Sequence, residues 1–173
     1  MLAKYFKALK QNERTLVFVA FTAEEVGGFG SQYFSQQFDP NKVTAMFNIE
    51  MIGTESKWGK NSAYITGYEK TDMGTILQRT WKEPGLHSIP ILTPHKIYFT
   101  ALIMPRWPGS VYPHTLSPLP KWTSEPNYHK LSDQIETLDM DNMAMIIKSI
   151  ALSSRTIVSG KDSPARVKVE ELR

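Results

Sequence analysis

The sequence predicts an α/β fold built on parallel strands. Two continuous apolar runs, residues 15–22 (TLVFVAFT) and 43–52 (VTAMFNIEMI), have the β-branched and aromatic composition of strands that are covered on both faces. A pair of glycines breaks the chain after the first run, and residues 30–38 are typical of a helix. Strand, helix and strand in so short a stretch form a βαβ unit, which implies parallel strands and a right-handed crossover.

The remaining elements follow in chain order. Residues 1–11 predict an amphipathic helix, because Leu2, Phe6 and Leu9 recur at helical spacing. Asp39 and Pro40 are expected to end the helix over residues 30–38. Further elements are expected as a strand over residues 62–66, a helix over 71–82 and an apolar helix over 140–153 that packs on the sheet. Residues 90–126 hold most of the 11 prolines, so little regular structure is expected there.

Composition narrows the classes of function. The chain has 173 residues, a net charge of +3 and no cysteine, so disulfides and thiolate metal sites are excluded. The small basic excess gathers near the C-terminus, which favours a solvated tail over nucleic-acid binding. No apolar run is long enough to predict a membrane span. The oligomeric state stays open.

Three carboxylates stand where a metal site is expected. Glu24 and Glu25 follow the first predicted strand, and Glu50 lies near the end of the second. In an open α/β sheet, ligands bind beyond the carboxyl ends of the strands. Two adjacent carboxylates there suit a metal ion, or alternatively a helix N-terminus that favours negative charge. For Glu50 in its apolar strand, a metal or a buried cation are the two simple explanations.

Among the four histidines, His129 is the one to which a role can be given. It lies in a loop before Asp133, whose position suits capping of the turn that leads to the last helix. Taken alone, a histidine in a loop is commonly just a surface residue. The other three lie in or near the proline-rich stretch, and no role is assigned to them.

Three sequence blocks resemble those of the M28 family of zinc exopeptidases, which includes aminopeptidases and the related glutaminyl cyclases. They are FTAEEVGGFGSQYF, FNIEMIG and EPNYHKLSDQIETLD, in the family's order. The resemblance implies a three-layer α/β/α sandwich with a mostly parallel central sheet, here incomplete. It also implies a hydrolase that uses two zinc ions to remove N-terminal residues from peptides with a free N-terminus.

The resemblance carries roles onto matching residues. Glu24 would be the general base that takes a proton from water, and Glu25 would bind one zinc together with His129. Glu50 would bind the second zinc, at a position where the family usually has Asp. Two close cations lower the pKa of bound water and polarise the carbonyl under attack. The alternatives are a one-zinc glutaminyl cyclase-like transferase and an inactive, truncated copy of the peptidase.

Two departures from the family pattern matter. No His precedes His87 and no Asp precedes Asp39, whereas the family's other ligands, a His and a bridging Asp, lie upstream. Residues 1–158 are therefore expected to be the C-terminal part of a single peptidase domain, followed by a polar tail over 159–173. We expect an N-terminally truncated copy. Similar enzymes are often periplasmic or secreted, but no signal peptide is present and the compartment stays open.

The second departure is the segment over residues 95–122, which resembles nothing in the family. Read one base out of phase, it can encode a Ser-Asp-Asn block and a following Gly-Val-Pro strand. The shifted codons after Met104 and Trp107 must both be Ala, and the one after Trp122 must be Asp, as that pattern requires. Paired frameshifts explain the segment. Translated as written, it replaces a core strand, so exposed apolar surface, an unpaired sheet edge and poor folding are expected.

Overall fold

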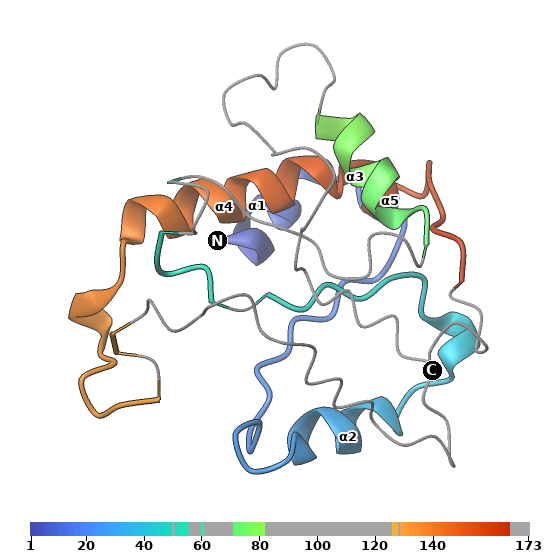
Figure 1. Cartoon of the computed structure of the whole chain (residues 1–173). Helices are drawn as coiled ribbons and strands as arrows, with labels where there is room; N and C mark the ends of the chain where they lie inside the picture. The colour runs from blue at the N-terminus through green and yellow to red at the C-terminus, as the bar shows by residue number, and fades with distance from the viewer. Residues whose placement is uncertain (50, 56–59, 61–70, 82–125, 128, 167–173) are drawn as a thin grey trace.

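The structure is a computed structural model, and it describes residues 1–49, 51–55, 60, 71–81, 126–127 and 129–166. Its described part is a group of helices joined by long extended segments (Figure 1). The elements are α1 (Leu2–Leu9), α2 (Phe29–Ser35), the 3-10 turn η1 (Pro40–Lys42), α3 (Met73–Trp81), the 3-10 turn η4 (Ile135–Thr137), α4 (Met140–Ser153) and α5 (Arg155–Val158). Helix α2 lies apart from the other helices, on the opposite side of the molecule.

The predicted α/β/α sandwich with a parallel sheet is wrong for the described residues, which contain helices and no strand. Residues 15–22 and 43–49 run without regular structure, although both have the composition of strands. A strand forms only where another extended segment pairs with its backbone and other elements cover its side chains. Here Val17 and Phe18 remain 55% and 54% exposed. The predicted strand over residues 62–66 lies outside the described residues.

Helix α4 confirms the predicted helix over residues 140–153, but it packs on helices rather than on a sheet. It contacts α1, α3 and α5, and it buries Ile146, Ile150 and Ala151. Its start is set by Asp139, whose side chain accepts a hydrogen bond from the Asn142 backbone N–H at 2.9 Å. Such an N-cap satisfies one of the backbone donors that the first turn leaves unpaired.

A buried apolar cluster joins residues of α3 and α5. Met73, Ile76, Leu77 and Ile157 make up a buried cluster, and the half-buried Ala45 and Phe47 pack against it. Residues 43–49 thus contribute side chains to a helical core instead of forming a central strand. The predicted helix over residues 71–82 is confirmed as α3.

Two further helices form where they were predicted, but each is shorter than predicted. Helix α1 lies within the predicted residues 1–11 and buries Phe6. Helix α2 ends at Ser35, before the expected stop at Asp39 and Pro40. Asp39 instead accepts the Asn41 backbone N–H at 2.9 Å and leads into η1. Among the described residues, no helix is both long and apolar enough to cross a membrane.

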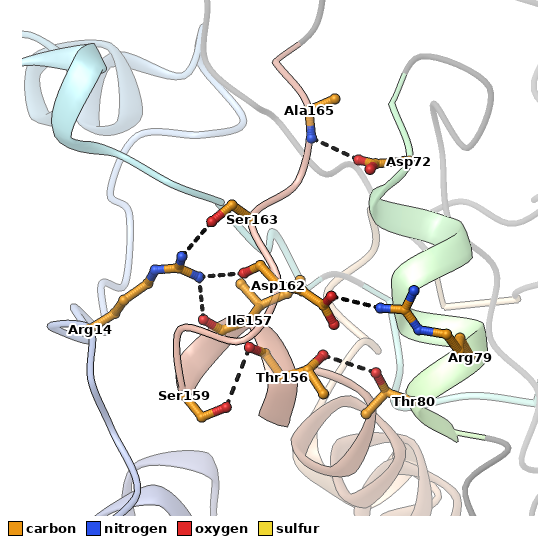
Figure 2. Close-up of polar contacts among 10 residues, drawn as sticks. All are labelled: Arg14, Asp72, Arg79, Thr80, Thr156, Ile157, Ser159, Asp162, Ser163 and Ala165. Carbon is orange, nitrogen blue, oxygen red and sulfur yellow. Dashed lines mark hydrogen bonds and ion pairs between the residues drawn. The ribbon is translucent and has the colours of Figure 1, made fainter.

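A polar network joins α3, α5 and the residues that follow α5 (Figure 2). The guanidinium of Arg14 donates to the backbone oxygens of Ile157 and Asp162 and, at 2.6 Å, to Ser163 Oγ. Asp162 also accepts from Arg79 Nη2 at 2.7 Å. Residues 159–166, expected to begin a polar tail, thus make specific contacts with the helices. The division of the chain at residue 158 itself stays a prediction.

Candidate functional site

Glu24 and Glu25 lie in a tight turn between residues 15–22, which are extended, and α2. The Glu24 backbone oxygen accepts hydrogen bonds from the N–H groups of Gly27 and Gly28, at 3.1 and 2.9 Å. Ala23 and Gly28 both have positive φ, 55° and 67°, so the chain reverses sharply around the two glutamates. Both carboxylates are exposed at the tip of this turn. The glycines explain why the turn can close: Gly tolerates left-handed backbone without a steric cost.

The turn is tied to Thr22, at the end of residues 15–22, through Gly30. Its backbone N–H donates to the Thr22 oxygen at 3.1 Å. A Cβ at position 30 would lie 2.4 Å from that same oxygen and 2.7 Å from Thr22 N, so only glycine fits this approach. The ring of Phe21 also packs edge-on against Phe34 of α2, with centroids 5.5 Å apart. These contacts fix where residues 23–28 project from the helix.

His129 lies in a loop that precedes η4 and α4. Its φ of 57° is left-handed, and the loop is closed by backbone hydrogen bonds from Lys130 to Asn127 and from Asp133 to Lys130, at 2.9 and 3.0 Å. The expectation that Asp133 caps the following turn is wrong. Gln134 occupies the N-cap of η4 without a side-chain hydrogen bond, and the cap of α4 is Asp139.

The structure brings Glu25 and His129 together, although they are far apart in the sequence. Glu25 Oε2 lies 3.2 Å from His129 Nε2, and the side chains are 69% and 55% exposed respectively. The two groups can form an ion pair when the imidazole is protonated. They can also share a cation, since neutral imidazole and carboxylate are both common zinc ligands. Their exposure leaves them accessible to a solute.

The other two predicted site residues are Glu24 and Glu50. Glu24 is the neighbour of Glu25 in the same turn, and Glu50 lies outside the described residues. Within the part of the chain that the structure describes, His, Asp and Glu side chains form no group of three or more that could hold a metal ion. The described site is therefore a pair of potential ligands with a second carboxylate adjacent in sequence.

Sequence reasoning missed a junction between residues 51–54, which follow Glu50, and the start of α4. The Asp139 backbone N–H donates to the Gly53 oxygen at 2.7 Å, and buried Asn142 donates from Nδ2 to the Thr54 oxygen at 3.0 Å. The signal was present, because an Asp directly before an apolar helical run is a typical N-cap. The backbone partner of a buried Asn is not visible in a sequence.

The carboxylate of Asp139 also pairs with Lys60, with 2.7 Å between Oδ2 and Nζ. The backbone N–H of Asn142, followed by the bond to Lys60, lowers the pKa of Asp139 below its usual range. Hydrogen bonds and a nearby cation both favour the charged form. Asp139 thus remains a charged cap at neutral pH. It has a structural role, outside the Glu25–His129 pair.

Comparison with known proteins gives one match. The family model described as Peptidase family M28 matches residues 1–153, which is well over half of the chain. The search of curated proteins and the search of solved structures returned no match. The matched range contains all four predicted site residues.

Proposed function

Since the chain belongs to peptidase family M28, we propose that it acts as a zinc-dependent exopeptidase that hydrolyses the first peptide bond of peptides with a free N-terminus. The contact between Glu25 and His129 is the observation that carries this proposal. It joins the two sequence blocks from which a shared zinc site was predicted.

The distance between the two groups suits a common zinc ion. Two ligand atoms on a tetrahedral zinc lie about 3.3 Å apart when each bond is about 2.0–2.1 Å long. Glu25 Oε2 and His129 Nε2 are separated by 3.2 Å. The donor types fit zinc as well, because imidazole nitrogen and carboxylate oxygen are both common zinc ligands. Glu25 and His129 would hold one zinc, and Glu50 would contribute to a second.

The residues of the chain then have separate tasks. Zinc, when bound, supplies positive charge that polarises the substrate carbonyl and lowers the pKa of a coordinated water. Glu24 accepts a proton from the attacking water and returns it to the leaving amine, as a general base and then a general acid. The tight turn over residues 23–28 supports this division, since it holds Glu24 beside Glu25 at an exposed tip. Glu25 and His129 position the cation and take no proton.

The proposal is tested by separating zinc binding from hydrolysis in the full chain. Zinc affinity is measured by titration calorimetry, and hydrolysis is followed with amino-acid anilides. We expect Glu25→Gln and His129→Ala each to weaken zinc binding by at least about tenfold, because each removes a ligand. Glu24→Gln should retain zinc affinity and lose about 10²–10⁴-fold in hydrolysis, because it removes only the proton acceptor.

Glu136→Gln is the matched control, because Glu136 is an exposed carboxylate in η4, outside the pair. It should change neither zinc affinity nor hydrolysis. Unchanged zinc affinity in both Glu25→Gln and His129→Ala would contradict the proposed site. Zinc affinity lost equally in Glu136→Gln would show that binding is a general property of surface carboxylates.

A second candidate function is that of an inactive member of the family. It is favoured by the absence, among the described residues, of any group of three potential ligands. Catalytic zinc sites usually take three ligands from the protein, so a site with two binds the ion weakly. The same titration separates the candidates: weak zinc binding without measurable hydrolysis in the unmodified chain identifies an inactive copy.

A further inference from the structure

Helix α2 carries aromatic side chains on two faces. On the inner face, the half-buried Phe34 packs within the chain: its ring centroid lies 5.5 Å from that of Phe21 and 4.8 Å from that of Phe38. On the outer face, Phe29 and Tyr33 are 60% and 69% exposed. These two residues are four positions apart, so they are neighbours on the helix surface. A surface helix ordinarily presents polar residues to solvent, whereas an exposed aromatic pair is suited to an apolar ligand.

The outer face of α2 begins at the turn that holds Glu25. Gly27 follows Glu25 closely, and a Cβ placed on Gly27 would lie 3.4 Å from Cζ of Phe29. The Phe29 ring therefore lies over the turn. The helix then runs away from the loop over residues 129–135, which is orange in Figure 1. Because Glu25 contacts His129 of that loop, the pair stands at one end of the outer face, and Tyr33 lies toward the other.

Charge and spacing indicate which ligand fits this arrangement. Glu24 and Glu25 are exposed and place negative charge at one end of the outer face, which favours the free ammonium end of a peptide. From Phe29 to Tyr33 the helix advances about 6 Å, and alternate residues of an extended peptide, whose side chains point to the same side, are about 6.6 Å apart. A peptide whose amino end lies at the pair can thus place alternate side chains against the two rings.

We propose that Phe29 and Tyr33 form a subsite for the part of a peptide substrate that follows the cleaved bond, and that this subsite selects peptides with apolar second and fourth residues. The second residue of the peptide contacts Phe29, beside the pair, and the fourth contacts Tyr33, one helical turn farther on. The inference deepens the proposed function and rests on it, because the first peptide bond has to lie at the Glu25–His129 pair.

The selection follows from the apolar surface that these contacts remove from water. A tenfold gain in affinity requires burial of about 55 Å² of apolar surface at about 25 cal/mol per Å². Two leucine side chains on two exposed rings offer more than this area, even though an open surface covers each of them only in part. Serine offers almost none. Replacing two serines of a peptide by leucine should therefore tighten binding by at least about tenfold.

Peptide binding to the full chain tests the subsite without relying on hydrolysis. The probes are Ala-Leu-Ser-Leu-Ser-Ser, Ala-Ser-Ser-Ser-Ser-Ser and Ala-Ser-Leu-Ser-Leu-Ser. Each carries a fluorescent label at its C-terminus, and its first peptide bond is reduced to a methylene-amine, so that it cannot be hydrolysed. Fluorescence polarisation in zinc-containing buffer gives each Kd. The first peptide should bind at least about tenfold more tightly than the second. It should bind at least about threefold more tightly than the third, whose leucines point to the opposite side.

Substitutions on α2 should remove this preference. Phe29→Ser and Tyr33→Ser should each reduce the ratio of the first two Kd values by about threefold, because each removes one of two apolar contacts. Affinity for the all-serine peptide should stay the same, which shows that the variants are folded. Phe29→Leu, which keeps an apolar side chain, should retain most of the preference. Phe18→Ser is the matched control: Phe18 is 54% exposed and lies outside α2, so this variant should keep the full preference.

Equal Kd values for the first two peptides would overturn the subsite, as would a full preference in both Phe29→Ser and Tyr33→Ser. Equal binding of the first and third peptides would overturn the alternate spacing. A Phe29→Ser variant that changes the sedimentation of the chain, but not its affinity for peptides, would assign the outer face to a second copy of the chain and overturn the inference.

Failure of the subsite is distinguishable from failure of the proposed function. A chain that prefers the first peptide but hydrolyses no anilide supports the subsite and contradicts the proposed function. A chain that hydrolyses anilides but binds the first two peptides equally contradicts the subsite alone.

Discussion

Two regions of this molecule contrast in how they are held together. The first, the helical group, consists of α1, α3, α4 and α5, which bury the apolar side chains of Met73, Leu77 and Ile150 among others. The second, the site region, consists of residues 15–35 and 126–127 with 129–135. It holds the Glu25–His129 pair, and most of its large apolar side chains are exposed.

The difference shows which kinds of structure can form from local sequence. A helix satisfies its own backbone hydrogen bonds, so an amphipathic helix needs only one apolar contact face to be stabilised. A strand satisfies none of its own and depends on neighbours. In the described residues, the helical group has such contacts, whereas the strand-like segments of the site region have no ladder. The predictions below test this contrast, from the largest expected effect to the smallest.

Hydrogen exchange should separate the two regions most strongly. Backbone amides in the centre of α4 should exchange only through global unfolding, whereas those of residues 15–21 lack partners among the described residues and should exchange almost freely. At concentrations where the chain is monomeric, we expect protection to differ by a factor on the order of 10³ or more. The measurement is mass-detected exchange with peptide-level resolution. Equal protection in both regions would contradict the contrast.

Truncation of one apolar side chain in each region should give the next largest effect. Leu77 is buried in the cluster between α3 and α5, so Leu77→Ala should lower the free energy of unfolding by about 2–5 kcal/mol. Val26 is an apolar residue of the site region and is exposed. Val26→Ala should therefore change the free energy of unfolding by less than about 0.5 kcal/mol. Urea unfolding followed by circular dichroism measures both values. Similar losses in the two variants would show that the regions share one core.

Arg14, directly before residues 15–22, joins them to the end of the helical group. Arg14→Ala removes three hydrogen bonds from one guanidinium to Ile157, Asp162 and Ser163, and should cost about 1–3 kcal/mol. Arg79 makes one ion pair to Asp162 with a side chain that is 62% exposed, so Arg79→Ala should cost less than about 1 kcal/mol. The same urea experiment measures both. A larger loss of unfolding free energy in Arg79→Ala than in Arg14→Ala would contradict this prediction.

The smallest predicted effect is a dependence of stability on pH through Asp162. The Thr156 hydroxyl, followed by Arg79, lowers the pKa of this carboxyl in the folded chain. Because the folded pKa lies below the unfolded one, the carboxylate stabilises the fold above the ordinary value of about 3.9. This contribution is lost as the pH falls through the lowered pKa. At pH 6, Asp162→Asn should therefore have a lower melting temperature than the unmodified chain. The difference between the two melting temperatures should shrink as the pH falls towards about 2.

The helices were predictable because their signals are local. Residues 140–153 were predicted with both ends correct, since the apolar composition that marks this helix lies within one short stretch. The predicted ends of α1 and α3 lie within two residues of the observed ends, for the same reason. The sheet could not be decided locally. Whether residues 15–22 become a strand depends on which segments pair with them, and pairing partners are not encoded in the run itself.

The sequence by itself determined the family, the order of the helices and the candidates Glu24, Glu25, Glu50 and His129, because each depends on residue types at fixed spacings. Only the tertiary structure decided that Glu25 meets His129, that Asn142 holds residues 52–54, and that Arg14 ties down the segment after α5. The physical reason is distance along the chain. Contacts between residues this far apart form only when the packing of intervening elements brings them together, so they depend on the whole fold and not on any local pattern.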